Sequence, residues 1–226
     1  MKMKAFKAAI PHTIPVFSGY ICLGLAYGIY MHQLGFSFWY PFLMSIFIYA
    51  GSMQFLCGSI LLSTFNPIYT FIITLVVNAR HIFYGIAMLS KYKDADTLKP
   101  YLIFALTDET FSVNTSVQAP NDVDKNLFYF FISILNHSYW VVASLIGGIL
   151  GELIQFNIAG IEFVMTALFV VIFVEQWLST KYHFPALCGL LVSLCCLVIF
   201  GSSHFIIPSM LCIALLLIFY DQKEVL

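Results

Sequence analysis

Three polar side chains, those of Asn78, Arg80 and His81, lie inside a segment that is otherwise apolar from Pro67 to Leu89. Ionisable groups at membrane depth are costly and mark functional sites by default. A guanidinium can hold a carboxylate through two parallel hydrogen bonds. A lone histidine can relay a proton, although it more often orients a neighbouring group. We therefore expect Arg80 to belong to the working centre, with Asn78 hydrogen-bonding a small ligand.

Two acidic residues, Asp108 and Glu109, lie in the next apolar segment along the chain. A short loop joins the two segments, which can therefore pack antiparallel. Counted back from this loop, Arg80 and Asp108 lie at a similar depth, about nine to eleven residues in, at roughly 1.5 Å per residue. The two charges can form a stabilising ion pair. Alternatively, Arg80 binds a substrate carboxylate while Asp108 or Glu109 carries a proton. The sequence leaves both interpretations open.

A third polar group, Gly51, Ser52 and Gln54, lies in the middle of the apolar segment Trp39–Thr64. The Gly-Ser pair weakens a helix, and the side chains of Ser52 and Gln54 need hydrogen-bond partners. A broken or re-entrant helix at this place would offer free backbone groups to a ligand, as in many transporters. An intact helix with a polar interface is the alternative.

The elements that must position these groups are set by composition. Hydrophobic residues make up 61% and charged residues 9% of the 226 residues, with a mean hydropathy of +0.93. Soluble domains carry about 25% charged residues. Apolar runs long enough to cross a bilayer of roughly 30 Å recur along the chain. The sequence therefore predicts an all-α, polytopic integral membrane protein with a single transport domain over residues 1–226.

Other classes of protein are disfavoured by what the sequence lacks. It contains no nucleophile elbow, no zincin helix and no phosphate loop, so we expect no enzyme. The six cysteines fall in apolar segments without metal-ligand spacing, so we expect neither a metal site nor a cofactor. The sequence has no basic patch of the kind that binds nucleic acid, so we expect no nucleic-acid partner.

The basic residues suggest how often the chain crosses the membrane. They cluster near the N-terminus, between Lys91 and Lys99, and singly at Lys125, Lys181 and Lys223. Eight full crossings would put the Lys91–Lys99 loop outside, against the positive-inside rule. Six full crossings place all of these residues inside, if Trp39–Thr64 and the segment from 101 to 118 enter and return on one side. Independent signs of breakage in these two segments are Gly51-Ser52 and the polar run from Asp108 to Ser116.

Weaker candidates lie outside these three groups. Gly24 and Gly28 share one face of the first apolar segment, and we expect them to serve close helix packing. The second half of the chain contains apolar segments at 127–150, 161–178, 184–200 and 206–220. The weaker candidates within or beside them are Asn136, His137, Glu162, Glu175 and His204.

Four motifs together resemble a known family. They are Pro15 with Gly24 and Tyr27-Gly28, the run from Ala50 to Phe55, the run from Asn78 to Gly85, and the run from Thr107 to Phe111. In this order and spacing the chain resembles the AzlC family, the large subunit of bacterial branched-chain amino acid exporters. The resemblance covers nearly the whole chain, although its specific motifs lie in the first half.

The resemblance implies a function. It implies export of leucine, isoleucine, valine and related apolar amino acids across the bacterial cytoplasmic membrane, driven by the proton gradient. It also implies a small, separately encoded AzlD-like membrane subunit as partner. The alternatives are a passive small-solute channel, a membrane subunit without transport of its own, and a membrane-embedded enzyme, which the missing motifs disfavour.

Overall fold

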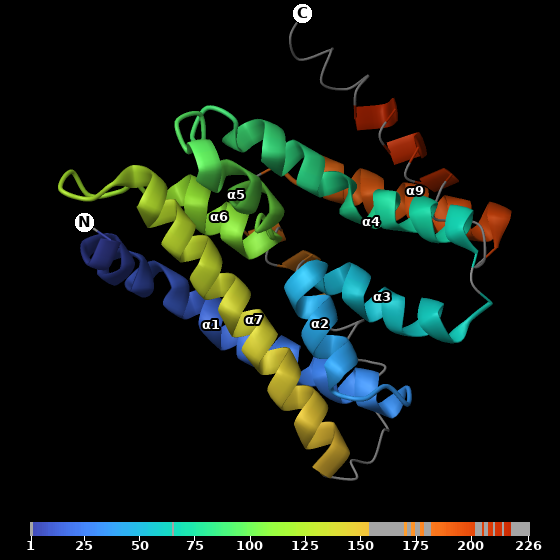
Figure 1. Cartoon of the computed structure of the whole chain (residues 1–226). Coiled ribbons are helices and arrows are strands. Elements are labelled where there is room, and N and C mark those ends of the chain that lie inside the picture. Colours follow the sequence, from blue (N-terminus) through green and yellow to red (C-terminus); the bar gives the residue numbers. More distant parts are fainter. Residues whose placement is uncertain are drawn as a thin grey trace, which may run out of the picture. The chain divides into compact units, whose positions relative to one another are not determined.

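The computed structural model describes residues 2–64, 66–153 and 182–201, together with short stretches between 170 and 178 and between 205 and 217. The chain divides into two compact units, Met1–Met165 and Thr166–Leu226. The regular elements of the described residues are all helices (Figure 1). In the first unit they are α1 (Lys2–Gln33), α2 (Trp39–Phe47), α3 (Gly51–Leu62), α4 (Pro67–Met88), the short 3₁₀ helix η1 (Asp96–Leu98), α5 (Lys99–Phe104), α6 (Asp108–Ser116) and α7 (Lys125–Leu153). The second unit contains α9 (Phe184–Phe200).

Three of the described helices, α1, α4 and α7, are long and apolar enough to cross a membrane. The apolar segments expected from the sequence therefore reappear as helices in the first unit, and α9 coincides with the predicted segment from 184 to 200. The predicted segments from 161 to 178 and from 206 to 220 lie largely outside the described residues.

Helices α1 and α7 lie side by side along their length (Figure 1). A Cβ atom added to Gly24 would lie 2.6 Å from the Cβ of Ala143, and one added to Gly28 would lie 2.6 Å from the carbonyl carbon of Gly147. Only hydrogen at these positions lets the two backbones approach so closely. The glycine pair therefore serves helix packing, as expected.

The second apolar segment is broken between α2 and α3. Tyr49 has a positive φ of 44°, which is unusual for a bulky residue, and α3 begins at Gly51 after the extended Ala50. Ala50 has no side chain that can cap the free N–H groups of the first turn. At the other end of α3, a Cβ added to Gly58 would meet Tyr30 and Leu34 at the C-terminal end of α1. An uninterrupted helix is therefore excluded.

The fourth apolar segment is also broken, but not where the sequence suggested. The polar run Asp108–Ser116, expected to mark the breakage, is itself helix α6, and the break precedes it at residues 105–107. The hydroxyl of Thr107 accepts the backbone N–H of Thr110 at 3.3 Å and so caps α6. The positive end of the helix dipole also stabilises the two acidic residues in the first turn.

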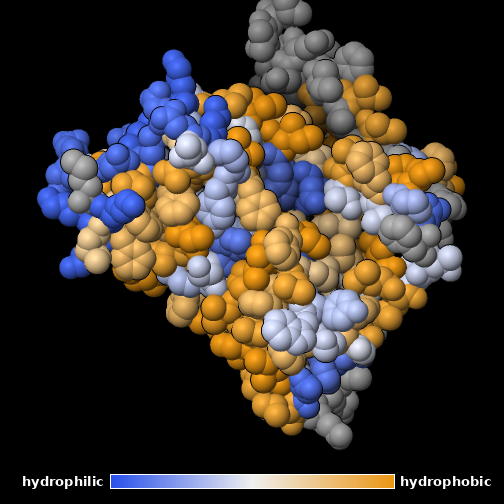
Figure 2. All heavy atoms as spheres, viewed as in Figure 1, coloured by the Kyte–Doolittle hydropathy of each residue, from blue (hydrophilic) through white to orange (hydrophobic). Residues whose placement is uncertain are grey.

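The N-terminal end of α1 and the loops that follow α4 and α6 lie together at one end of the first unit. Lys4 pairs with Asp122 at 3.2 Å, and Asn126 donates to the carbonyl of Asp94 at 2.7 Å. Lys91 donates to the carbonyls of Asn114 and Val117, which closes the C-terminal end of α6. We call this the basic end; hydrophilic residues gather over it at the upper left of Figure 2.

Lys91 is half-buried at the basic end. Its ammonium group lies 4.8 Å from the centre of the Tyr129 ring, in addition to its bonds to the α6 carbonyls. Burial, with a smaller contribution from Lys125, lowers the pKa of Lys91 below its ordinary value. Because Lys91 binds the last carbonyls of α6, its positive charge complements the negative end of the α6 dipole.

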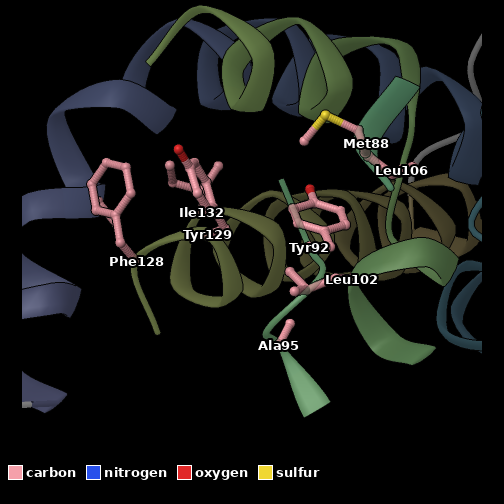
Figure 3. Close-up of a cluster of buried hydrophobic side chains, with 9 residues drawn as sticks. Met88, Tyr92, Ala95, Leu102, Leu106, Phe128, Tyr129 and Ile132 are labelled. Atoms are coloured by element: carbon pink, nitrogen blue, oxygen red, sulfur yellow. The ribbon is translucent and has the colours of Figure 1, made fainter. Parts of the chain in front are cut away.

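Two hydrophobic clusters frame the broken segments. In one of them Met88, Tyr92, Leu102 and Tyr129 pack together (Figure 3). The other surrounds both breaks and joins α1, α3 and α7; its buried members are Val16, Tyr20, Tyr27, Met31, Tyr49, Phe55, Ala105 and Trp140. The same hydrophobic cluster therefore packs around both breaks, through Tyr49 at the first and Ala105 at the second.

Candidate functional site

Arg80, the only arginine in the sequence, joins α4 to both broken segments. Its Nε lies 2.9 Å from Oδ1 of Asp108 at the start of α6, and its Nη2 donates to the hydroxyl of Ser52 at the start of α3 at 3.2 Å. The Nε–H is not aligned with the carboxylate, so this contact is an ion pair without a directed hydrogen bond. The side chains of Arg80 and Asp108 are 34% and 26% exposed, so the pair is accessible.

Tyr84 is a second link between α4 and α6. Its hydroxyl donates to the same Oδ1 of Asp108 at 2.7 Å, and its ring stacks on Phe111 with centroids 4.3 Å apart. Tyr84 follows Arg80 by four residues, so both side chains lie on one face of α4. Asp108 is therefore bound from α4 by a charge and by a hydroxyl.

Glu109 points away from α4, toward α1. Oε2 of Glu109 accepts the hydroxyl of Tyr20 at 2.8 Å. The Tyr20 hydroxyl also lies 2.7 Å from the hydroxyl of Thr107, which donates to that of Thr110 at 3.1 Å. Asn136 of α7 donates to the Thr110 hydroxyl at 3.2 Å. We call these five residues the Glu109 chain.

A separate set of hydrogen bonds fixes the break between α2 and α3 to α7. Gln54 donates to the hydroxyl of Ser45 at 3.0 Å and accepts the indole N–H of Trp140 at 2.9 Å. Nε2 of His137 lies 3.1 Å from the carbonyl of Ser45, and its Nδ1 lies 2.9 Å from the hydroxyl of Tyr101. Helix α7 thus holds both broken segments.

The structure brings together some of the residues predicted for the site and separates others. Ser52, Arg80 and Asp108 are in direct contact, as the depth estimate predicted for Arg80 and Asp108. Glu109 faces α1, on the other side of the α6 start. Gly51 packs beside the Trp140 ring, where an added Cβ would lie 3.4 Å from the ring, so its contact is with the scaffold.

Three further predicted residues do not reach the Arg80 guanidinium by hydrogen bonds. Gln54 is used by the α7 contacts, and Nδ1 of His81 lies 3.2 Å from the backbone carbonyl of Asn78 in the same helix. The side-chain oxygen of Asn78 has no hydrogen-bond partner among the described residues. The weaker candidates Glu162, Glu175 and His204 lie outside the described residues.

Several residues of the site were missed from the sequence. Tyr84 had a signal, its spacing of four from Arg80, and so did Thr107, a threonine directly before two acidic residues, which is the pattern of a helix start. Tyr20 had none, because its contact with Glu109 joins positions 89 residues apart. Asn136 and His137 were noticed, but only as weak candidates.

The chemistry of this centre is that of charge recognition. Helices α3 and α6 both have their N-termini at this centre. Helix N-termini attract anions. Arg80 adds a cation, and Asp108 and Glu109 add carboxylates. Among the described residues, no group of His, Cys, Asp and Glu has the arrangement of a metal site. The centre therefore suits a small molecule that carries both signs of charge.

Comparison with known proteins gives matches over most of the chain. A family model described as "AzlC protein" matches residues 15–154. The "Branched-chain amino acid transport protein AzlC" of Bacillus subtilis is 54% identical, over 92% of this chain and 82% of the relative. An "Uncharacterized membrane protein" of Haemophilus influenzae is 46% identical, over 95% and 88%. The "Inner membrane protein YgaZ" of Escherichia coli is 24% identical, over 81% and 76%. No solved structure matches the chain.

Proposed function

This chain belongs to the AzlC family of membrane transport proteins, and from this membership we propose that it exports branched-chain amino acids across the bacterial cytoplasmic membrane. The Bacillus subtilis relative is named for branched-chain amino acid transport. A role in membrane amino acid transport follows from the family, while the export direction, the coupling to protons and the single transport domain over residues 1–226 belong to the proposal.

The position of Arg80 is the observation that carries the proposal. Its guanidinium lies between the starts of two half-helices and holds Asp108 through Nε and Ser52 through Nη2. Within the described residues, no hydrogen bond to Nη1 is formed, so the guanidinium keeps N–H groups for a substrate carboxylate. The uncapped first turn of α3 offers further N–H donors. A zwitterion can therefore bind here without displacing Asp108.

We include a small AzlD-like membrane subunit in the proposal. Its support in the structure is the outer surface of α4, where Ile68, Phe71 and Phe83 are 71%, 67% and 69% exposed. Lipid tails or an apolar membrane helix would cover such a surface equally well. The experiments below are therefore done both with and without this subunit.

The proposal predicts a specific activity in vesicles. Vesicles preloaded with unlabelled leucine should accumulate labelled leucine by counterflow when they contain the chain, with or without a co-expressed AzlD-like subunit. The unlabelled competitors isoleucine, valine and methionine should reduce the signal, whereas lysine should not. A passive channel would give flux down the gradient without counterflow, and a subunit that transports nothing would give no signal in either preparation.

The basic end also predicts the topology. Because Lys4, Lys91 and Asp122 gather there, we expect this end to face the cytoplasm, with segments 39–64 and 101–118 re-entrant. The variant Asp122→Cys should react with a membrane-impermeant maleimide in inverted vesicles and remain unlabelled in intact cells. Unsubstituted protein measures labelling of the native cysteines. Labelling of Asp122→Cys in intact cells alone would place this end outside.

A further inference from the structure

The two neighbouring acids of the centre have different partners. Asp108 is compensated by the Arg80 guanidinium and also accepts the Tyr84 hydroxyl. Glu109 accepts the hydroxyl of Tyr20, but neither ion pair formed among the described residues includes it. A hydroxyl supplies a hydrogen bond without supplying a charge. Glu109 is therefore a carboxylate without a compensating cation in the part of the chain that the structure describes.

A carboxylate without a cation is costly in the low dielectric of a membrane protein. Two states remove this cost: the carboxylate takes up a proton, or a cation binds beside it. The ammonium group of an amino acid is such a cation. Both states satisfy the same oxygen atoms, so a proton and an ammonium group compete for Glu109.

Unpaired polar atoms border the Glu109 chain. The hydroxyl of Tyr49 is buried, with 3% of the residue exposed, and forms no hydrogen bond to the described residues. The hydroxyls of Tyr20, Thr107 and Thr110 lie near enough to interact with it, although none forms a hydrogen bond of regular geometry. Oδ1 of Asn136, a fully buried residue, also lacks a partner. Buried polar atoms are normally paired, because leaving one unpaired is costly. These atoms indicate that a hydrogen-bonding ligand completes this place.

We propose that Glu109 is the site where a proton and the ammonium group of the substrate replace each other, while Asp108 remains the fixed counter-ion of Arg80. This assignment rests on the proposed function, because it requires an amino acid as the substrate. When the ammonium group arrives, the O–H bond of protonated Glu109 breaks and the proton leaves to water. The remaining carboxylate pairs with the ammonium group, and no other bond changes.

Exclusive binding determines the mode of coupling. Because Glu109 accepts a proton or an ammonium group but not both, the apparent dissociation constant of each rises with the concentration of the other. A carrier of this kind moves the amino acid in one direction and the proton in the other. An inward proton gradient would then drive export.

The test is proton release from the purified full chain, with the small subunit present if counterflow requires it. Leucine is added to protein in weakly buffered detergent solution containing a pH-sensitive dye. We expect wild-type protein to release about one proton per bound leucine, whereas Glu109→Gln releases none. Glu152→Gln, which neutralises an exposed glutamate on α7, is the matched control and should release protons as the wild type does.

Two leucine analogues test the same assignment without any substitution. The amine 3-methylbutylamine keeps the ammonium group and should release protons from wild-type protein. The acid 4-methylpentanoate keeps only the carboxylate and should release none, although it competes with leucine for Arg80. Release by the acid and not by the amine would overturn the assignment of Glu109.

The possible failures can be told apart. If Glu109→Gln still transports leucine and releases the same number of protons, Glu109 is not the exchange site, although the proposed function stands. If wild-type protein neither binds nor transports branched-chain amino acids, the proposed function fails, and this assignment fails with it. If Glu109→Gln does not fold, Tyr20→Phe replaces it. That variant keeps the carboxylate without its donor, so proton release should persist with a shifted pH midpoint, and an unchanged midpoint would contradict the assignment.

Discussion

Replacement of Arg80 by alanine should reduce leucine counterflow by roughly 100-fold while the protein still inserts in the membrane. The substitution removes the cation that binds the substrate carboxylate and leaves Asp108 without its compensating charge. The substitution also removes the hydrogen bond that the guanidinium donates to Ser52 at the start of α3. The measurement is counterflow of labelled leucine, normalised to the amount of protein in the vesicle membrane.

Two further variants of α4 sharpen this test. Arg80→Lys keeps the charge but loses the planar fork that binds a carboxylate and Ser52 together, so it should recover only a small part of the activity. Gly85→Ala changes a position of the same helix where an added Cβ has no neighbour within 4 Å, and it should transport normally. Normal counterflow by Arg80→Ala would show that the arginine only stabilises the fold.

Replacement of Gly28 by alanine should prevent the first unit from folding. The added methyl group would overlap the backbone of α7 at Ser144 and Gly148, and neither backbone can move away without separating the helices. Overpacking of this kind costs about 3 kcal/mol when neighbouring atoms cannot shift. The yield of monodisperse, detergent-solubilised protein in size-exclusion chromatography measures the effect.

Gly19→Ala provides a control on the same helix. An added Cβ at Gly19 meets no atom within 4 Å, and alanine favours a helix over glycine by up to about 1 kcal/mol. This variant should therefore give as much folded protein as the wild type. Equal yields from Gly28→Ala and Gly19→Ala would show that α1 and α7 pack less closely than the structure indicates.

Features that depend on neighbouring residues were predictable from the sequence. The apolar segments gave the helices, and the distance from a shared loop gave the contact between Arg80 and Asp108. The pair Gly51-Ser52 marked a break that lies directly before it, at residues 48–50. For the helices and the break the physical cause, a hydrophobic run or a weak helix former, lies within the segment itself. For the contact between Arg80 and Asp108 it is the short loop that places both residues at one depth.

Features that join distant segments were not predictable. Glu109 and Asp108 are adjacent, yet one faces Tyr20 on α1 and the other faces Arg80 on α4. Hydropathy gives the depth of a residue but not the helix that covers its face. The run from Asp108 to Ser116 was misjudged for a related reason, because polar side chains in a membrane segment can be satisfied by another helix. For example, Asn114 donates a hydrogen bond to Ser133 of α7, and Thr110 accepts one from Asn136 of α7.

The glycine contact between α1 and α7 has a consequence for biosynthesis. Gly28 and Gly148 lie roughly 120 residues apart, so at about 5–20 residues per second the ribosome makes α7 some 6–24 s after the glycine face of α1. During this interval that face must be covered by lipid or by an insertion factor. Both broken segments are made within the same interval and wait for the helix that holds them. Assembly of the centre is therefore a late event, governed by the arrival of α7.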